Sequence, residues 1–234
     1  MRNSFITLFI LFFCTNFILA QRTADPFQIL VDNGNISTTF INKNSKIEGS
    51  PYVVDKFSPA KISILGNKIY SVKYNAFHDE VAVLGDDNVL YSLRKDSRKD
   101  IFVTYIIQKK TYQIYSYLNN DGIQDSGFFI VMSNQNSNIK LLKKERIIFI
   151  GEKKSVSSYA DSEPSQYKRI SDKYFIKIGE ENARILPRNK KEFSNLFPEY
   201  NKDIMTYIKS ERIKLNNEKD LLKILSFLNS LNLS

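Results

Sequence analysis

Short runs of alternating apolar and polar residues fill the chain from Pro26 to about Pro187, and turn residues separate the runs. Successive side chains of a β-strand point to opposite faces of a sheet, so this period of two indicates strands with one buried face. No stretch between the runs has the length and period of a helix, which argues against a parallel α/β fold. The predicted fold class is α+β and mainly β: an antiparallel meander forming a curved sheet, barrel or sandwich, followed by a small C-terminal helical part.

Turn residues predict where the strands reverse. Gly66 and Asn67 tolerate positive φ, so they predict a two-residue hairpin between 60–65 and 68–72. Polar turns at 85–88 and 119–122 predict two further reversals. About ten strands are expected in all, drawn from residues 60–65, 68–72, 80–84, 89–93, 102–108, 111–118, 126–132, 139–142, 146–150, 174–178 and 183–186.

The period changes to that of a helix after Pro187. Residues 190–196 suit a short helix, and Pro198 suits the first position of the next, where its missing N–H is not needed. Asn217 is placed to cap a last helix, in which Leu221, Leu222, Ile224, Leu225, Leu228 and Leu231 cover a broad apolar face. We therefore divide the chain into a signal at 1–20, a β-rich domain at 21–187 and a helical subdomain at 188–234, and we expect the helices to dock on the β-rich domain.

The N-terminus has the pattern of a cleavable export signal. Arg2 precedes an apolar run from Phe5 to Phe13, which is shorter than the roughly 20 residues of a membrane-spanning helix. Cleavage is expected near Ala20, which leaves a periplasmic or extracellular protein. A lipid anchor on Cys14 is the alternative, but the bulky Phe13 stands where a small residue is needed, so we interpret Cys14 as part of the apolar run. No later apolar run approaches the length of a transmembrane span.

The charge of the chain is moderately basic, with 34 Lys and Arg against 25 Asp and Glu and a net charge of +9. Nucleic acid is not an expected partner outside the cytoplasm. The excess of positive charge fits an anionic envelope surface or an acidic polysaccharide, and it also fits a simple contribution to solubility. The partners expected from composition are therefore an anionic surface or another envelope protein.

Residues able to support catalysis or metal binding are few. His78 is the only histidine, and we interpret it as a polar turn residue because no second His and no Cys after the signal could complete a metal site. Aligned as a calcium loop, the turn at Gly122 would place Tyr117 and Phe128 at carboxylate positions, so it is interpreted as a hairpin turn. Ser50 lacks the motif of a nucleophilic serine. No cofactor, no metal site and no catalytic or binding residue is predicted.

One basic stretch and two acidic residues are candidate functional groups. The stretch comprises Lys140, Lys143, Lys144, Arg146, Lys153 and Lys154, and alternating apolar positions favour a solvated strand face over an anion-binding surface. Glycoside hydrolysis needs only two suitably spaced carboxylates, so Glu80 and Asp121 keep open the alternative of a hydrolase acting on sugars or peptides.

Four segments resemble a family of exported bacterial proteins of unknown function: 49–52 with Phe57, 73–81, 159–161 and 225–231. The resemblance extends over most of the chain after the signal. It implies an export signal, a β-rich body and a helical C-terminus, and it assigns no functional residues. The leading hypothesis is a non-enzymatic envelope or extracellular protein that binds a partner through the sheet surface or the helices, and the carboxylate-dependent hydrolase is the alternative.

Overall fold

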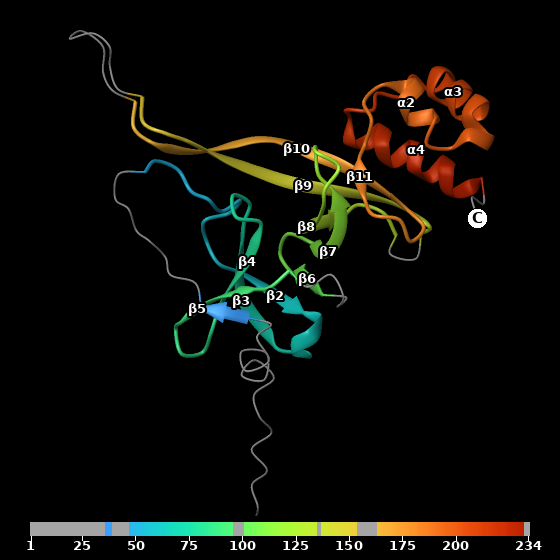
Figure 1. Ribbon diagram of the computed structural model, residues 1–234. Helices are drawn as coiled ribbons and strands as arrows, with labels where there is room; N and C mark the ends of the chain where they lie inside the picture. The colour runs from blue at the N-terminus through green and yellow to red at the C-terminus, as the bar shows by residue number, and fades with distance from the viewer. Residues whose placement is uncertain (1–35, 39–46, 96–100, 135–136, 154–162, 232–234) are drawn as a thin grey trace, which may run out of the picture.

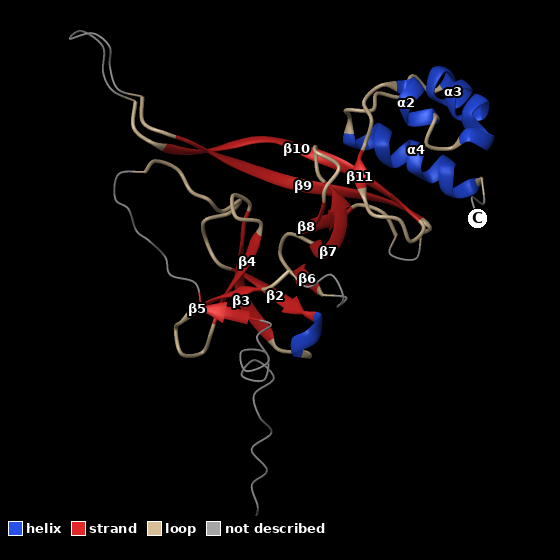
Figure 2. Ribbon diagram, in the orientation of Figure 1, coloured by secondary structure: helices blue, strands red, loops and turns tan. Residues whose placement is uncertain are grey.

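A computed structural model describes residues 36–38, 47–95, 101–134, 137–153 and 163–231. The described part contains one antiparallel sheet of eleven strands (Figures 1 and 2). The predicted fold class, mainly β with a small C-terminal helical part, is confirmed. The strands are β1 (Ile36–Thr38), β2 (Ser58–Ile62), β3 (Ile69–Asn75), β4 (Glu80–Leu84), β5 (Leu90–Leu93), β6 (Phe102–Tyr105), β7 (Lys110–Leu118), β8 (Gln124–Val131), β9 (Ile139–Ile150), β10 (Gln166–Ile178) and β11 (Arg184–Ile185).

The strand order across the sheet is β1-β5-β4-β3-β2-β6-β7-β8-β9-β10-β11. Strand β2 therefore lies between β3 on one side and β6 on the other, pairing Ala60 with both Tyr70 and Tyr105. From β2 the chain runs outward to β5, and it then resumes at β6 on the other side of β2. We call the first half, β2–β5, the N-terminal wing and the second half, β6–β11, the C-terminal wing.

The sheet curls strongly within the C-terminal wing. The first half of β7 pairs with β6, whereas its last residues bond to the segment just before β11. Leu118 donates its backbone N–H to the Ala183 carbonyl at 2.9 Å, and Ala183 donates to the Ser116 carbonyl at 2.9 Å. This contact closes β7–β11 into a small barrel, which Tyr115, Phe129, Leu142, Phe175 and Ala183 fill.

A larger core lies in the curl between the two wings. Residues of β2, β3 and β4 meet residues of β6, β7 and β8 there, so both wings contribute to one apolar cluster. Tyr74, Tyr105 and Tyr112 pack their rings together inside it, with ring centroids 4.6 Å apart for Tyr74 and Tyr112 and 5.3 Å apart for Tyr105 and Tyr112. Burial of this many aromatic rings supplies much of the apolar area that stabilises a domain of this size.

The helices group at one end of the long β9–β10 hairpin (Figure 1). They are α2 (Lys190–Ser194), the 3-10 turn η2 (Pro198–Tyr200), α3 (Asn201–Ser210) and α4 (Glu218–Ser230). The expected caps are present: Asn189 accepts hydrogen bonds at the start of α2, and Asn217 accepts the backbone N–H of Asp220 at 3.2 Å. No helix in the described residues is long and apolar enough to cross a membrane.

One apolar cluster joins the helices to the sheet, which confirms that they dock on the β-rich part. Leu221, Ile224, Leu225 and Leu228 of α4 pack with residues of β9 and β10, including Ile139, Leu141 and Ile176. The broad face predicted for the last helix is therefore buried, except at Leu231, which is partly buried, and at Leu222, which is 37% exposed. The exact domain division at residue 187 remains a prediction, because the core crosses that boundary.

Several strand bounds differ from the sequence prediction, and three of the differences are instructive. The prediction of a two-residue hairpin at Gly66-Asn67 is wrong in the length of the connection. A 3-10 turn, η1 (Ser63–Leu65), precedes Gly66 and places Leu65 in the core. The two strands expected at 139–142 and 146–150 are one continuous strand, β9. Strand β10 begins at Gln166, eight residues before the predicted start at Tyr174. The predicted export signal and cleavage point lie outside the described residues.

Candidate functional site

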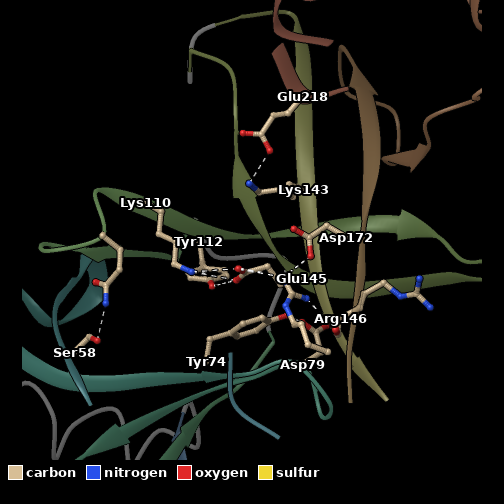
Figure 3. Close-up of polar contacts among 12 residues, drawn as sticks. Ser58, Tyr74, Asp79, Lys110, Tyr112, Lys143, Glu145, Arg146, Asp172 and Glu218 are labelled. Carbon is tan, nitrogen blue, oxygen red and sulfur yellow. Dashed lines mark hydrogen bonds and ion pairs between the residues drawn. The ribbon is translucent and has the colours of Figure 1, made fainter. Parts of the chain in front are cut away.

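Asp79 lies at the centre of a polar network that links the two wings across the curl (Figure 3). It sits in the turn between β3 and β4 with a positive φ of 57°. Its Oδ1 accepts hydrogen bonds from the Tyr74 hydroxyl at 2.8 Å and the Phe128 backbone N–H at 3.2 Å. Its Oδ2 accepts from Lys144 Nζ at 2.8 Å and from Lys95 Nζ at 3.5 Å. Four donors therefore satisfy one largely buried carboxylate.

Glu145 is the centre of a second network on β9 (Figure 3). Its carboxylate accepts from the Tyr112 hydroxyl, from Lys110 Nζ at 3.2 Å and from an Arg169 Nη at 3.5 Å. Burial and the negative charge of Glu145 raise the pKa of Tyr105 and Tyr112 well above 10, so both tyrosines keep their protons over the physiological range. Glu145 is buried but fully engaged with donors.

These two carboxylates are structural cross-links. A catalytic acid or base needs a lone pair or a proton that faces substrate, whereas Asp79 and Glu145 direct theirs at side chains of neighbouring strands. Gly127 of β8 makes room for the first network: a Cβ there would lie 2.7 Å from Asp79 Oδ2 and would also collide with Lys144 Nζ. Lys144 packs against the rings of Tyr117 and Phe129, and burial lowers its pKa despite the nearby Asp79.

The residues considered from sequence are dispersed over the structure. His78 is exposed in the β3–β4 turn with its ring against Phe77. Asp121 is exposed in the β7–β8 turn, and Glu80 starts β4; within the described residues no hydrogen bond or ion pair joins the two. Ser50 donates a hydrogen bond to Asp55 at 2.9 Å. No group of three or more His, Cys, Asp or Glu in the described part is arranged to hold a metal ion.

The basic stretch of β9 is mostly neutralised within the protein. Lys143 pairs with Glu218 at the start of α4 at 2.9 Å, Lys144 pairs with Asp79, and Lys153 pairs with Glu163 at 3.2 Å. Lys154 lies outside the described residues. This stretch therefore anchors a helix and braces the curl. The interpretation as a solvated strand face is wrong for Lys143 and Lys144, whose side chains are only 18% and 14% exposed because they pair with acidic residues of other elements.

A different group of positive charges surrounds a groove between β10, β11 and the helices. Two adjoining hollows, of about 790 and 610 Å³, share Arg188, Leu215 and Asn216 in their walls and form what we call the basic groove. Six cationic side chains line it: Lys173, Arg188, Lys190, Lys209, Arg212 and Lys214. None of the six forms an ion pair within the described residues.

The local structure explains why these charges face the groove. Residues 212–216 alternate between exposed and buried, so Ile213 and Leu215 anchor the α3–α4 connection in the core while Arg212 and Lys214 point outward. Asp220 accepts the backbone N–H of Lys214 at 3.0 Å and fixes this connection. The inner end of the groove is a bulge of β10, where Ser171 and Asp172 together oppose Glu145 of β9.

The one carboxylate that lines the groove is engaged by a neighbour. Asp172 forms an ion pair with Arg169, three residues before it on the same strand. Because the lining is otherwise basic, the groove carries a large uncompensated positive charge over an apolar floor of Leu186, Ile213 and Leu215. Such an arrangement suits an anionic ligand, since each unpaired cation offers free N–H donors.

The chain has no significant match among family models, curated proteins or solved structures. Sequence reasoning also missed the basic groove, and for a clear reason. Its cations come from β10, the β11–α2 connection, the end of α3 and the α3–α4 connection, with acidic residues interspersed along the chain. No local run of charge marks them, and only the docking of the helices on the sheet assembles the groove.

Proposed function

We propose that this protein is an exported, non-enzymatic binding protein that holds an anionic component of the cell envelope in the basic groove. The observation that supports the proposal is the set of six cations around the groove that have no anionic partner in the described residues. Other described lysines also form no ion pair, among them Lys56, Lys61 and Lys109, but these three do not line the hollows. The six cations of the groove differ from them because they line two adjoining hollows.

The side chains of the groove favour binding over catalysis. Its lining offers cations, apolar contacts and the Asn216 amide, while Asp172, its single carboxylate, is held by Arg169. The carboxylates that do converge, Asp79 and Glu145, are saturated by donors within the protein. Neither set supplies the pair of free acid and base that hydrolysis of a sugar or peptide needs.

Export is the part of the proposal that rests on sequence. The apolar run from Phe5 to Phe13, followed by the small Ala20, has the pattern of a cleaved signal. Outside the cytoplasm the abundant polyanions are acidic polysaccharides and anionic lipid surfaces. A groove of this length, with cations along both hollows, suits an extended acidic chain better than a single small ion.

The proposal is tested by measuring binding of dextran sulfate, with neutral dextran of the same length as the control ligand. We expect dextran sulfate to bind and dextran not to bind, with an affinity that falls as salt is raised because charged contacts are screened. The variant Lys209→Gln/Arg212→Gln/Lys214→Gln removes three charges from the groove and should weaken binding by about tenfold or more, since each exposed charge contact contributes modestly.

A matched variant separates the groove from net charge. Lys56→Gln/Lys61→Gln/Lys109→Gln removes the same number of charges from exposed positions on and beside the sheet, away from the groove. It should bind dextran sulfate nearly as well as the unaltered protein. If both triple variants lose affinity equally, binding reflects overall charge and the proposed function is wrong.

A further inference from the structure

The inner end of the basic groove has two cations in the wall of one hollow, Lys173 and Arg188. Lys173 lies just after the bulge of β10, and Arg188 lies in the connection between β11 and α2. Burial and then the positive charges of Arg146 and Arg188 lower the pKa of Lys173. Like charges repel one another, and the repulsion is relieved when an anion binds between them.

No internal anion fills that role in the described part of the chain. Lys173 Nζ donates to the neutral Asn120 side chain at 3.3 Å, which leaves two of its three N–H donors free. Arg188 forms no ion pair there. The nearby Asp172 is already neutralised by Arg169.

We infer that the inner end of the basic groove is a subsite for a phosphomonoester, held by Lys173 and Arg188. This inference rests on the proposed function and names the chemical group that the ligand carries at this end. A phosphomonoester has a charge of about −1.5 to −2 at pH 7 and three acceptor oxygens, so it can compensate two cations at once. A sulfate ester or a carboxylate carries one charge and leaves one cation without compensation. The guanidinium group of Arg188 also matches a pair of phosphate oxygens.

The two ends of the groove therefore have different tasks. The inner end, beside the bulge, is walled by two strands and takes a compact group of high charge density. The outer end is open and contacts the rest of the ligand; it is lined by Lys190, Lys209, Arg212 and Lys214. A sugar phosphate and a lipid phosphate headgroup present the same phosphomonoester, so either source satisfies the inner end.

Methyl phosphate and methyl sulfate test the assignment, because they match in size and shape and differ in charge. Isothermal titration calorimetry of the purified protein at pH 7.5 should give about tenfold tighter binding of methyl phosphate, since charge-assisted contacts to the dianion are stronger. The variant Lys173→Gln should remove this preference. Lys61→Gln, an exposed change on β2, should preserve it, and circular dichroism should show both variants folded.

The same titrations identify the source of the phosphate group. Glucose 6-phosphate and vesicles containing phosphatidic acid are each titrated against the protein and against Lys173→Gln, and binding of either that depends on Lys173 supports the subsite. Equal affinities for methyl phosphate and methyl sulfate overturn it. If dextran sulfate binding still depends on the outer groove in that case, the proposed function stands without the subsite, so the two failures are distinguishable.

Discussion

Lys144 of β9 donates a 2.8 Å hydrogen bond to Asp79, which lies in the β3–β4 turn of the opposite wing. In the strand order, four strands of the sheet separate β9 from β3, yet the curl brings the two side chains into contact. Both are only about one-seventh exposed, at 14% and 15% of their side-chain surface. The ion pair therefore links the two wings across the open side of the curled sheet.

Removal of Lys144 is expected to destabilise the fold strongly. Lys144→Ala leaves the buried Asp79 carboxylate without its nearest cation, and loss of one partner of a buried pair costs about 3 kcal/mol or more. Lys68→Ala breaks the pair of Lys68 with Asp86, whose side chains are 44% and 75% exposed, and should cost no more than about 1 kcal/mol. Urea unfolding of both variants provides the comparison, and equal losses would contradict a bridging role for Asp79.

Substitution of Gly127 should disturb the same pair by steric means. A Cβ at this position would lie 2.7 Å from Asp79 Oδ2, so Gly127→Ala forces the ion pair apart and is expected to cost about 1–3 kcal/mol, as overpacking does elsewhere. Gly151→Ala is the control, because nothing lies within 4 Å of its added Cβ. The two melting temperatures decide the matter: a Gly127→Ala protein as stable as Gly151→Ala would show that the pair tolerates the displacement.

Truncation of a buried side chain of α4 should show how much stability comes from docking of the helix on the sheet, as opposed to the helix itself. Leu225 is 6% exposed and packs in the cluster that the helices share with β9 and β10, so Leu225→Ala is expected to cost about 2–5 kcal/mol. Leu222, on the same helix, is 37% exposed, and Leu222→Ala should cost well under half of that. Calorimetric unfolding distinguishes the two, and similar losses would argue that the helix is stabilised mainly by its own residues.

The contact of α4 with the sheet should weaken in acid. A hydrogen bond from Lys143, followed by one from Tyr174, lowers the pKa of Glu218 below its ordinary value of 4.5, against the opposing effect of burial. Because the folded pKa is the lower one, ionised Glu218 contributes stability above pH 4.5 that is lost as pH falls through the folded pKa. The difference in melting temperature between the protein and Glu218→Gln should therefore be largest near neutral pH and shrink below about pH 4. A difference that is constant with pH would contradict this linkage.

The elements that follow a strict period were predictable, and those set by distant contacts were not. The capping by Asn217 and the buried face of α4 follow from local sequence. The first half of β10 was missed because Lys168 and Arg169 are exposed and the bulge at Ser171 interrupts the alternation. The length of the turn after β2 was predicted wrongly. Gly66 marks where the chain reverses, but the burial of Leu65 in the core adds a 3-10 turn before it.

The candidate site lies at the limit of what sequence can predict. The basic stretch of β9 is a visible run of charge, yet Lys143, Lys144 and Lys153 have internal partners. Lys173, Arg188 and Arg212 are far apart along the chain and carry no shared motif. Their proximity depends on the docking of helices on a bulged strand, and a one-dimensional pattern contains no measure of that geometry.

The central place of β2 also makes its pairing with β6 a contact that closes a long loop of the chain. Most neighbouring strands of the sheet follow one another directly in sequence, whereas β2 pairs with β6 across the whole N-terminal wing, Ala60 opposite Tyr105. Local pairings form quickly and distant ones slowly, since loop closure costs chain entropy. We therefore expect the β2–β6 ladder to form in the rate-limiting step of refolding. Val103→Ala, in β6, should slow refolding in stopped-flow experiments, whereas Leu228→Ala, in α4, should chiefly accelerate unfolding. The two wings would then form first as separate sets of hairpins. Pairing of β2 with β6 would join them and complete the rate-limiting step of folding.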